Sequence, residues 1–303
     1  MNKKILVIGS LNMDMVIPVK ELPQRGETIL GGSPDYIPGG KGANQACAAG
    51  KLGGSVTMLG KVGKDAMGRT LKENLAAAGV DVSPVEETSD APTGMAVIYV
   101  SETGSNSIVV IPGANALCDA SYIQANEDLI AASDIIVLQL EIPYEAVFRA
   151  IELAKKHRRL VVLNPAPAPD SLPPEVISKL DYFTPNETEL ARIAGLPVGG
   201  VEESIAAGKK LVSQGVGTVL ATLGEAGALL VTSQEAKVIP TLRVKAVDTT
   251  AAGDTFNGAF VTALAEGMDE AAAITFGNKA AAISVTRKGA QTSIPTRAEA
   301  DAY

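Results

Sequence analysis

The segment from Asp248 to Gly258, DTTAAGDTFNG, is the strongest candidate for a site that does chemistry. It follows a strand-like segment at 242–247, and it opens an apolar stretch that predicts a helix. Small residues at 251–253 would let the backbone approach a ligand, and N–H groups at a helix start favour anions such as a phosphoryl group. Asp254 would then be placed to accept a proton from an attacking hydroxyl. A helix-capping aspartate after a tight turn is an equally good interpretation of the pattern.

A second glycine-rich turn, GGKGANQ, runs from Gly39 to Gln45 and precedes another predicted helix. Its backbone groups could bind a polar ligand. It lacks the Gly-x-x-x-x-Gly-Lys-Ser/Thr spacing of a P-loop. A plain loop with a helix cap explains it about as well.

Polar residues also follow two predicted strands, where ligands bind in open α/β sheets. Asn12 and Asp14 alternate along an extended segment after the first strand, and Glu141 follows the strand predicted at 135–140. All three could hydrogen-bond sugar hydroxyls, although capping or turn formation is the alternative. No Gly-x-Gly-x-x-Gly follows the first strand, so a nicotinamide-binding site loses its main support.

Two further segments could contact phosphate. Asn186 and Glu189 lie three residues apart at a predicted helix start, so they share a face and could act on a hydrated Mg²⁺. A capping box is the strong alternative there. The segment Thr222–Gly227, TLGEAG, follows a strand and offers a hydroxyl and flexible backbone to a nucleotide.

His157 is the only histidine and lies in a basic run at a predicted helix end, so we assign it no catalytic role. With one histidine and no Cys/His pair, serine- or cysteine-triad chemistry is not expected. The net charge of −8 argues against a nucleic-acid partner. Cys47 and Cys118 have no metal-like spacing, which favours a reducing, cytoplasmic location. No apolar run approaches the length of a membrane span.

The elements that must position these residues alternate along the 303-residue chain. Continuous apolar runs predict strands at 5–8, 56–59, 135–140, 160–163 and 218–222. Amphipathic or Ala-rich stretches predict helices at 44–52, 65–78, 144–157, 201–214 and 254–266. Strand and helix in alternation predict a mostly parallel sheet.

Two segments break this alternation. Residues 13–38 have alternating apolar positions and no helix signal, and residues 93–112 predict a hairpin of 95–100 and 107–111 around the turn 102–106. Both could belong to a small separate sheet that acts as a lid. Irregular surface hairpins are nearly as compatible with the pattern.

Together these motifs resemble the ribokinase-like (PfkB) carbohydrate kinases over nearly the whole chain. The motifs that match in order are Gly9–Asp14, Gly39–Gln45, Asn164–Pro167, Thr184–Glu189, Asp248–Gly258 and Thr286–Gln291. The resemblance implies an αβα sandwich of three layers with a mostly parallel central sheet and a β-sheet lid. The core would comprise 1–12, 39–92 and 113–303, and the lid 13–38 and 93–112.

The resemblance also implies transfer of the ATP γ-phosphate to the 5-hydroxyl of D-ribose, with Asp254 as the base. Backbone N–H groups of Ala251, Ala252 and Gly253 would form the anion hole, although many family members have Gly at the first of these positions. The implied sugar-binding residues are Asn12, Asp14, Gly39, Gly40, Lys41, Asn44, Glu141 and Asp254. The implied nucleotide residues are Asn186, Glu189, Thr222, Gly224, Gly227, Gly253 and Asn278, with Asn186 and Glu189 organising Mg²⁺ and phosphate.

An activating K⁺ site is implied as well, mostly through main-chain carbonyls, at Asp248, Thr250, Ser284, Arg287, Gly289 and Ser293. Family members often form homodimers through their lids, and apolar residues such as Val16, Ile17, Val97 and Ile98 are consistent with that. They are equally consistent with lid strands that rest on their own domain. Two rivals stay open at this point. One is a related kinase acting on another sugar or a nucleoside. The other is a sugar-binding regulator without catalysis, which the intact Asp254 segment and the Asn186/Glu189 pair disfavour.

Overall fold

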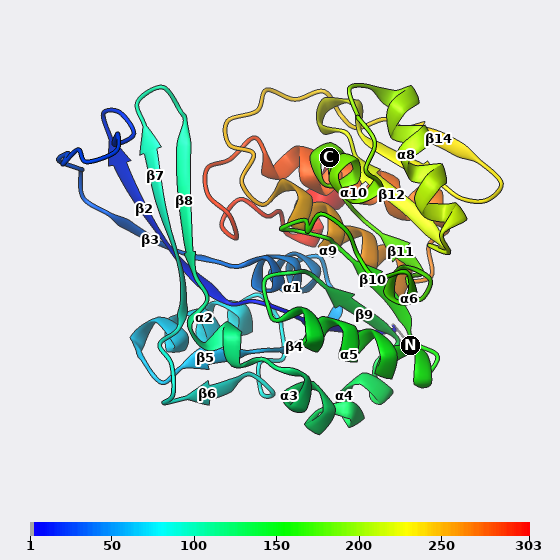
Figure 1. Cartoon of the computed structure of the whole chain (residues 1–303), viewed down its shortest axis with the longest axis horizontal. Helices are drawn as coiled ribbons and strands as arrows, with labels where there is room; N and C mark the ends of the chain where they lie inside the picture. Colours follow the sequence, from blue (N-terminus) through cyan, green and yellow to red (C-terminus); the bar gives the residue numbers. More distant parts are fainter. Residues whose placement is uncertain (1–2) are drawn as a thin grey trace.

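An eight-stranded sheet forms the centre of the computed structural model, which describes residues 3–303. The strands lie in the order β14-β13-β12-β11-β10-β9-β1-β4 (Figure 1). Neighbouring strands are parallel except in the pairs β12–β13 and β13–β14. Their bounds are β1 Lys4–Ile8, β4 Ser55–Leu59, β9 Ile135–Leu138, β10 Leu160–Leu163, β11 Tyr182–Phe183, β12 Thr218–Thr222, β13 Ala228–Val231 and β14 Ala236–Ile239.

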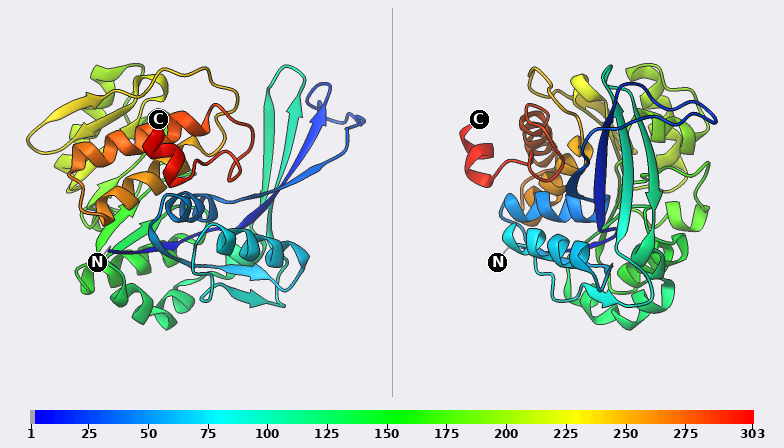
Figure 2. Two further views of the ribbon diagram at one scale, coloured as in Figure 1. Left: turned by 180° about the vertical axis from the view of Figure 1, so that it is seen from behind. Right: turned by 90° about the vertical axis from the view of Figure 1, so that its left-hand side faces the viewer.

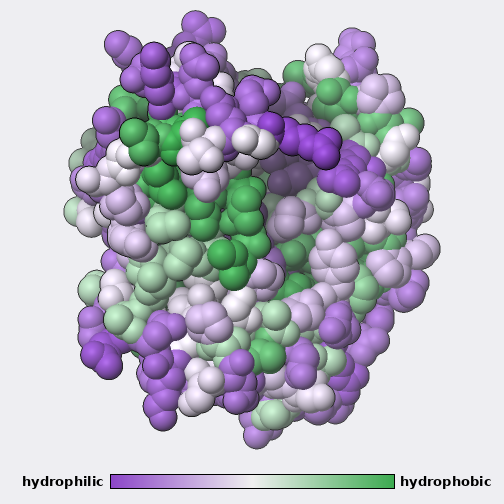
Figure 3. Space-filling view, turned by 60° about the vertical axis from the view of Figure 1, so that its left-hand side comes forward, coloured by the Kyte–Doolittle hydropathy of each residue, from purple (hydrophilic) through white to green (hydrophobic). Residues whose placement is uncertain are grey.

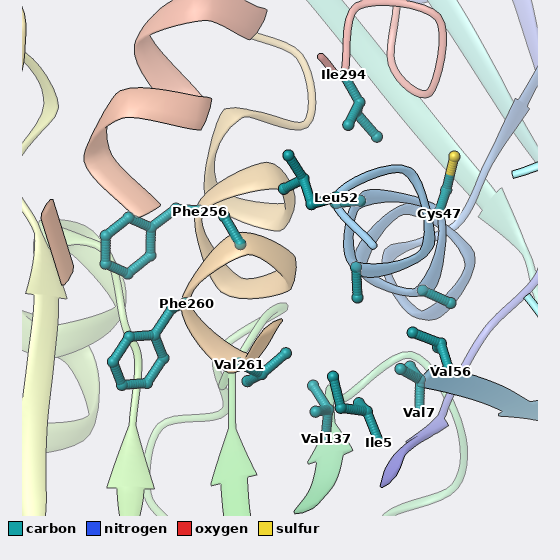
Figure 4. Close-up of a cluster of buried hydrophobic side chains, with 14 of the residues drawn as sticks. Ile5, Val7, Cys47, Leu52, Val56, Val137, Phe256, Phe260, Val261 and Ile294 are labelled. Carbon is teal, nitrogen blue, oxygen red and sulfur yellow. The ribbon is translucent and has the colours of Figure 1, made fainter. Parts of the chain in front are cut away.

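Helices cover both faces of this sheet because its strands are apolar on both sides (Figures 1 and 2). In β1, Ile5 and Val7 pack with α1, α9 and α10, as Figure 4 shows in part, whereas Leu6 and Ile8 pack toward α3, α5, α7 and α8. The helices are α1 Lys41–Lys51, α2 Ala66–Ala77, α3 Ala120–Ala125, α4 Glu127–Ala132, α5 Tyr144–Lys156, α6 Pro174–Ile177, α7 Glu187–Ala194, α8 Val201–Ser213, α9 Ala252–Ala265, α10 Glu270–Ser284 and α11 Arg297–Ala302. Two short 3₁₀ helices are η1 Gly113–Leu117 and η2 Gly224–Ala226.

The predicted three-layer αβα sandwich is therefore confirmed, and all ten core elements predicted from the sequence are present. Their ends differ by a few residues: α1 begins at Lys41, α9 begins at Ala252 and β9 ends at Leu138. The strand predicted at 242–247 was wrong. Among residues 3–303 no strand pairs with it, so the segment runs as exposed irregular chain, and Val247 is 56% exposed.

A second sheet of four strands stands away from the sandwich, in the order β3-β2-β7-β8 (Figures 1 and 2). It consists of β2 Asn12–Val19, β3 Asp35–Gly39, β7 Gly94–Ser101 and β8 Asn106–Ile111. The predicted hairpin is confirmed, since β7 and β8 pair antiparallel around a short turn. The segments 13–38 and 93–112 thus meet in one sheet, with β2 and β7 running parallel. Strands β5 Lys61–Gly63 and β6 Glu86–Thr88 form a separate pair.

One surface of this four-stranded sheet is apolar. Figure 3 shows apolar residues gathered on the face turned toward the viewer. Exposed apolar residues of this sheet include Tyr36 on β3 and Ile108 to Ile111 on β8, which are 45–54% exposed. Because side chains alternate along a strand, those of β8 are divided between its two faces. Val16, Ile17, Val97 and Ile98 are half-buried. Within residues 3–303, no helix is both long enough and apolar enough to cross a lipid bilayer.

Candidate active site

Asp254 lies in the first turn of α9, beneath the edge where the parallel strands end. The helix N-cap is Ala251, in a left-handed conformation with φ 57°, so the capping interpretation of Asp254 is wrong. The turn carries the chain from Asp248 into the helix and presents its first amides at the helix start, where they have no partner inside the helix. One of them, the Ala252 N–H, is directed to the carbonyl of Thr249 at 3.2 Å.

The Asp254 carboxylate is held by two amide side chains of α1. Asn44 Nδ2 donates to Oδ2 at 3.0 Å, and Gln45 Nε2 donates to Oδ1 at 2.9 Å. Asp254 is only 6% exposed. Both oxygens are therefore satisfied by neutral donors, which fix the direction of the carboxylate without an ion pair.

A cavity of about 210 Å³ opens in front of Asp254. Its walls bring together residues from five widely separated segments: Lys41, Asn164, Ala166, Thr184, Asn186, Glu189, Thr222, Thr249, Ala251, Ala252, Gly253, Asp254 and Asn257. Two buried oxygens on this wall, Thr184 Oγ1 and Asn257 Oδ1, have no hydrogen-bond partner within the described part of the chain. Buried polar atoms are nearly always paired, so this wall suits a polar ligand.

The residues expected to hold a sugar come together at the base of the four-stranded sheet. Asn12 and Asp14 lie on β2, opposite Gly39 and Ile37 of β3. A side chain at Gly39 would clash with Asp14, because an added Cβ would lie 2.2 Å from its Oδ2. Gly40 needs its glycine as well, since its φ is 88°.

Glu141 reaches the same place from the other side. Its Oε2 accepts hydrogen bonds from the Ser10 hydroxyl at 2.6 Å and from the Lys41 N–H at 3.0 Å. Strand β9 ends three residues earlier than Glu141, so the loop after the strand carries it to the glycine-rich turn. The charges of Asp14, Lys41 and Glu141 affect one another together with that of Asp254, and Asn44 donates directly to Asp254.

Acidic side chains dominate the electrostatic potential where Asp14, Lys41 and Asp254 meet. Burial, followed by the charges of Glu141 and Asp254, raises the pKa of Asp14 to about 7. Burial alone would lower the pKa of Lys41, but the carboxylates of Asp254, Glu141, Glu189 and Asp14 raise it instead. Burial also raises the pKa of Glu189. Lys41 thus stays a cation amid four carboxylates and lies on the cavity wall, where its charge could pair with an anionic phosphoryl group.

The residues expected along a nucleotide form two groups. Asn186, Glu189, Thr222 and Gly253 line the cavity, whereas Gly224, Gly227 and Asn278 do not. Asn278 Nδ2 donates to the carbonyl of Ile239 at 2.9 Å, and a Cβ at Gly227 would lie 2.2 Å from the same oxygen. The second group therefore gathers at 239–241, the segment that follows β14.

Asn186 and Glu189 also cap α7. The Asn186 side chain accepts from the Glu189 N–H at 2.8 Å, and Glu189 Oε2 accepts from the Asn186 N–H at 2.9 Å. The capping-box interpretation is confirmed, and both residues still lie on the cavity wall. The cap uses one oxygen of each side chain, which leaves the other carboxylate oxygen of Glu189 for further contacts.

The positions expected to hold a monovalent cation lie in two neighbouring segments. Asp248 Oδ1 accepts from the N–H and hydroxyl of Thr250, and its Oδ2 accepts from the Gly289 N–H at 2.9 Å. Ser284 and Ser293 are buried, with hydroxyls that donate to carbonyls of their own turns, and Arg287 pairs with Glu299. Burial opposes ionisation of Asp248, but the Thr250 and Gly289 donors prevail and lower its pKa. Among residues 3–303, no three His, Cys, Asp or Glu side chains cluster as metal ligands.

Several polar residues near Asp254 were not predicted as site residues. They are Ser10, Gln45, Asn115, Gln139, Asn164 and Gln291, and all are buried. Asn115, for example, donates from Nδ2 to Asn12 Oδ1 at 2.7 Å. Buried amides among apolar neighbours are the signal that could have found them, but burial is not visible in one sequence. His157 lies at the end of α5 and its Nε2 contacts Glu127 at 2.7 Å.

Comparison with known proteins agrees with this geometry. The model of the pfkB family carbohydrate kinases matches residues 2–297. The chain belongs to the PfkB family of carbohydrate kinases. Carbohydrate kinases are phosphotransferases, and the Asp254 carboxylate at the start of α9 suits that chemistry.

Individual PfkB relatives match over nearly their whole length. A ribokinase of Haemophilus influenzae is 44% identical over 99% of this chain and 97% of its own. A deoxyribokinase of Salmonella typhi is 40% identical over 99% and 98%. The structure of Arabidopsis thaliana ribokinase in complex with ribose and ATP superposes with a TM-score of 0.92, at 33% identity, over 100% of this chain and 98% of that one.

Proposed function

We propose that this carbohydrate kinase transfers the γ-phosphoryl group of ATP to the 5-hydroxyl of D-ribose. The observation that carries the proposal is the position of Asp254, oriented by Asn44 and Gln45 at the head of α9 and on the wall of a cavity. Support comes from the ribokinase relatives, one of which was solved with ribose and ATP. Because a deoxyribokinase is 40% identical, 2-deoxyribose is the alternative sugar to be tested.

In this mechanism Asp254 accepts the proton of the sugar hydroxyl as its oxygen attacks the γ-phosphorus. A new P–O bond forms to the sugar, and the bond between the γ-phosphorus and the bridging oxygen breaks to release ADP. Phosphoryl transfer depends mostly on positioning and charge stabilisation. The amides of Ala251, Ala252 and Gly253 would stabilise the charge that develops on the phosphoryl oxygens.

The sugar would bind between β2 and the glycine-rich turn. Asn12, Asp14 and Glu141 would hydrogen-bond its hydroxyls, together with Lys41, Asn44 and the backbone at Gly39 and Gly40. The nucleotide would extend from Asn186, Glu189, Thr222 and Gly253 on the cavity wall toward Gly224, Gly227 and Asn278. Both sets meet at Asp254, so the two substrates would face each other across this carboxylate.

Mg²⁺ is the expected partner of ATP, and Asn186 and Glu189 fit a hydrated ion. Mg²⁺ keeps most of its waters and uses few protein ligands. Glu189 has a carboxylate oxygen outside the capping box and faces the cavity. When bound, the ion would neutralise charge on the phosphates.

A K⁺ ion fits beside the anion hole, at the positions Asp248, Thr250, Ser284, Arg287, Gly289 and Ser293. A carboxylate with surrounding main-chain carbonyls is a hard-oxygen donor set, and the low pKa of Asp248 keeps that carboxylate ionised. The ion would hold 248–250 against 284–293, and thereby order the turn that leads into α9.

The four-stranded sheet would act as a lid over the sugar, with the lid at 13–38 and 93–112 and the core at 1–12, 39–92 and 113–303. Its closure would exclude water from the reaction. The exposed apolar residues of β8 support a homodimer formed through these lids, since single chains rarely expose such a patch. A reducing, cytoplasmic location is supported by Cys47 and Cys118, which are both free and buried.

The test is an ADP-release assay with ATP and a panel of D-ribose, 2-deoxyribose, D-fructose and adenosine, each in K⁺ and in Na⁺. Ribose should give the highest kcat/KM, with a higher rate in K⁺. A preference for deoxyribose or adenosine would replace the sugar assignment. Ribose binding without any ADP release would favour a sugar-binding regulator instead of a kinase.

A further inference from the structure

The amide of Gln45 is fully used inside the protein. Its Nε2 donates to Asp254 Oδ1 at 2.9 Å and to Asn164 Oδ1 at 3.1 Å, and its Oε1 accepts from Gln139 Nε2 at 2.7 Å. Gln45 and Gln139 are 0% exposed. An amide whose NH₂ group and oxygen are both paired with protein groups has a single orientation.

That orientation is set by a main-chain carbonyl. Asn164 Nδ2 donates to the carbonyl of Thr184 at 2.7 Å, and a carbonyl oxygen can only accept. The side-chain oxygen of Asn164 must therefore face Gln45. Gln45 must then donate to it from its NH₂ group. The same NH₂ group also donates to Asp254. The direction of each hydrogen bond, from the Thr184 carbonyl through Asn164 and Gln45 to the carboxylate, is thus fixed.

Gln139 secures the other end of the same amide. It lies just after β9, and its donor Nε2 can pair with Gln45 only if the Gln45 oxygen faces it. Gly9 makes room for this side chain, because a Cβ there would lie 2.1 Å from Gln139 Oε1. Residues that follow β9 and β10 thus both fix the orientation of the Gln45 side chain on α1.

Gln45 does not line the cavity, unlike Asp254. It reaches the cavity wall through two hydrogen bonds, one to the Asp254 carboxylate and one to Asn164 Oδ1. Asn44 differs, because it holds the other oxygen of Asp254 and is itself an expected sugar-binding residue. Gln45 is therefore a donor to the base that is not itself on the cavity wall.

We propose that Gln45, oriented by Asn164 and Gln139, is the positioning residue for Asp254, an inference that rests on the proposed function. Its hydrogen bond stabilises the ionised carboxylate and fixes the oxygen that takes the sugar proton. A misplacement of about 1 Å at a reacting centre can cost about 100-fold in rate. Gln45→Met keeps the length of the side chain and removes both donors.

The experiment is a double-mutant cycle of Gln45→Met and Asp254→Asn, begun by confirming ADP release by the wild type with ribose. We expect Gln45→Met to lower kcat about 10- to 100-fold, with both KM values changed less than about threefold. The acid limb of its kcat–pH profile should move to higher pH, since the ionised base has lost a donor. In the Asp254→Asn background, Gln45→Met should cause no further loss, because its effect passes through the carboxylate.

An unchanged kcat, or the same loss in both backgrounds, would overturn the inference while leaving the proposed function intact. An inactive wild type would instead count against the proposed function. Gln214→Met, at the exposed end of α8, controls for the effect of replacing any glutamine by methionine. If Gln45→Met does not fold, Gln139→Met replaces it. That variant should lower kcat about 3- to 10-fold with the same direction of the pH shift, and wild-type kinetics would overturn the inference.

Discussion

Asn44 and Asp254 are 210 positions apart in the sequence, yet the Asn44 amide donates to the Asp254 carboxylate at 3.0 Å. The contact joins the first turn of α1 to the first turn of α9. Asn44 is fixed in turn by Gln291, whose Nε2 donates to its Oδ1 at 3.0 Å. The glycine-rich turn, the head of α9 and the segment after α10 therefore form one polar unit around the carboxylate.

Gly253→Ala should separate stability from activity. An added Cβ at this helical position meets nothing within 4 Å, and alanine is favoured over glycine in a helix by about 0.5–1 kcal/mol. The variant should therefore unfold at a higher temperature. Its kcat should fall at least about 10-fold, because the methyl group enters the space expected for the phosphoryl oxygens.

The measurements are a thermal melt and steady-state kinetics on the same preparation. Gly200→Ala, whose methyl group also meets nothing within 4 Å but lies before α8, is the matched control. A wild-type kcat for Gly253→Ala would count against an anion hole at this turn.

Asp14→Asn should stabilise the protein at high pH. The pKa of Asp14 is about 7 in the folded protein against an ordinary value of 3.8, so the folded state alone binds a proton between these values. The contribution of this proton to the free energy of unfolding is fully present below about pH 4 and is lost as pH rises through about 7. The variant should then exceed wild type by roughly 1–4 kcal/mol at pH 8 and match it near pH 4.

Urea denaturation of both proteins across this pH range gives the difference directly. Asp35→Asn, an exposed carboxylate on the neighbouring strand, is the control and should track wild type. The Asp14→Asn variant should also bind ribose weakly. A stability difference independent of pH would contradict the raised pKa.

Asp248→Ala should abolish activation by K⁺. The change removes the carboxylate that joins 248–250 to Gly289, and with it the charged donor of the proposed ion. In K⁺ its kcat should fall about 10-fold, to the wild-type rate in a buffer of bulky organic cations. Glu299→Gln, which breaks the ion pair with Arg287 only, should keep the activation. Equal K⁺ activation of Asp248→Ala and wild type would remove this site.

Val109→Lys should separate a dimer into single chains. Val109 lies in β8 and is 54% exposed, and a charge there would have to be buried if two lids paired. Light scattering should give twice the chain mass of 31.1 kDa for wild type and that mass for the variant. Gln234→Lys, on the turn between β13 and β14, should stay dimeric. A wild type that is monomeric at micromolar concentration would refute the lid-mediated dimer.

Much of the sandwich was predictable because its signals are local. Continuous apolar runs identified strands such as β1 and β12, and Ala-rich or amphipathic stretches identified helices such as α1 and α5. The strand expected at 242–247, LRVKAV, is absent, because this strand-like segment pairs with no other strand among the described residues. Pairing is a tertiary property, and a single run does not carry it.

The site was predictable only in part. Asp254 and the glycine-rich turn have recognisable local sequences, and the capping alternative for Asp254 fell because the N-cap is Ala251. Gln139 and Asn115 gave no signal, because their importance depends on partners 94 and 103 positions away. Such amides are identified only when the fold buries them against each other.

The most direct test is the turnover of Asp254→Asn with saturating ribose and ATP in K⁺, alongside ribose binding by calorimetry. Asparagine keeps the shape and can still accept from Gln45, but it cannot take the sugar proton. We predict a kcat about 10²- to 10⁴-fold below wild type, with ribose affinity changed only a few-fold. Turnover equal to wild type would contradict the role of Asp254 as the base.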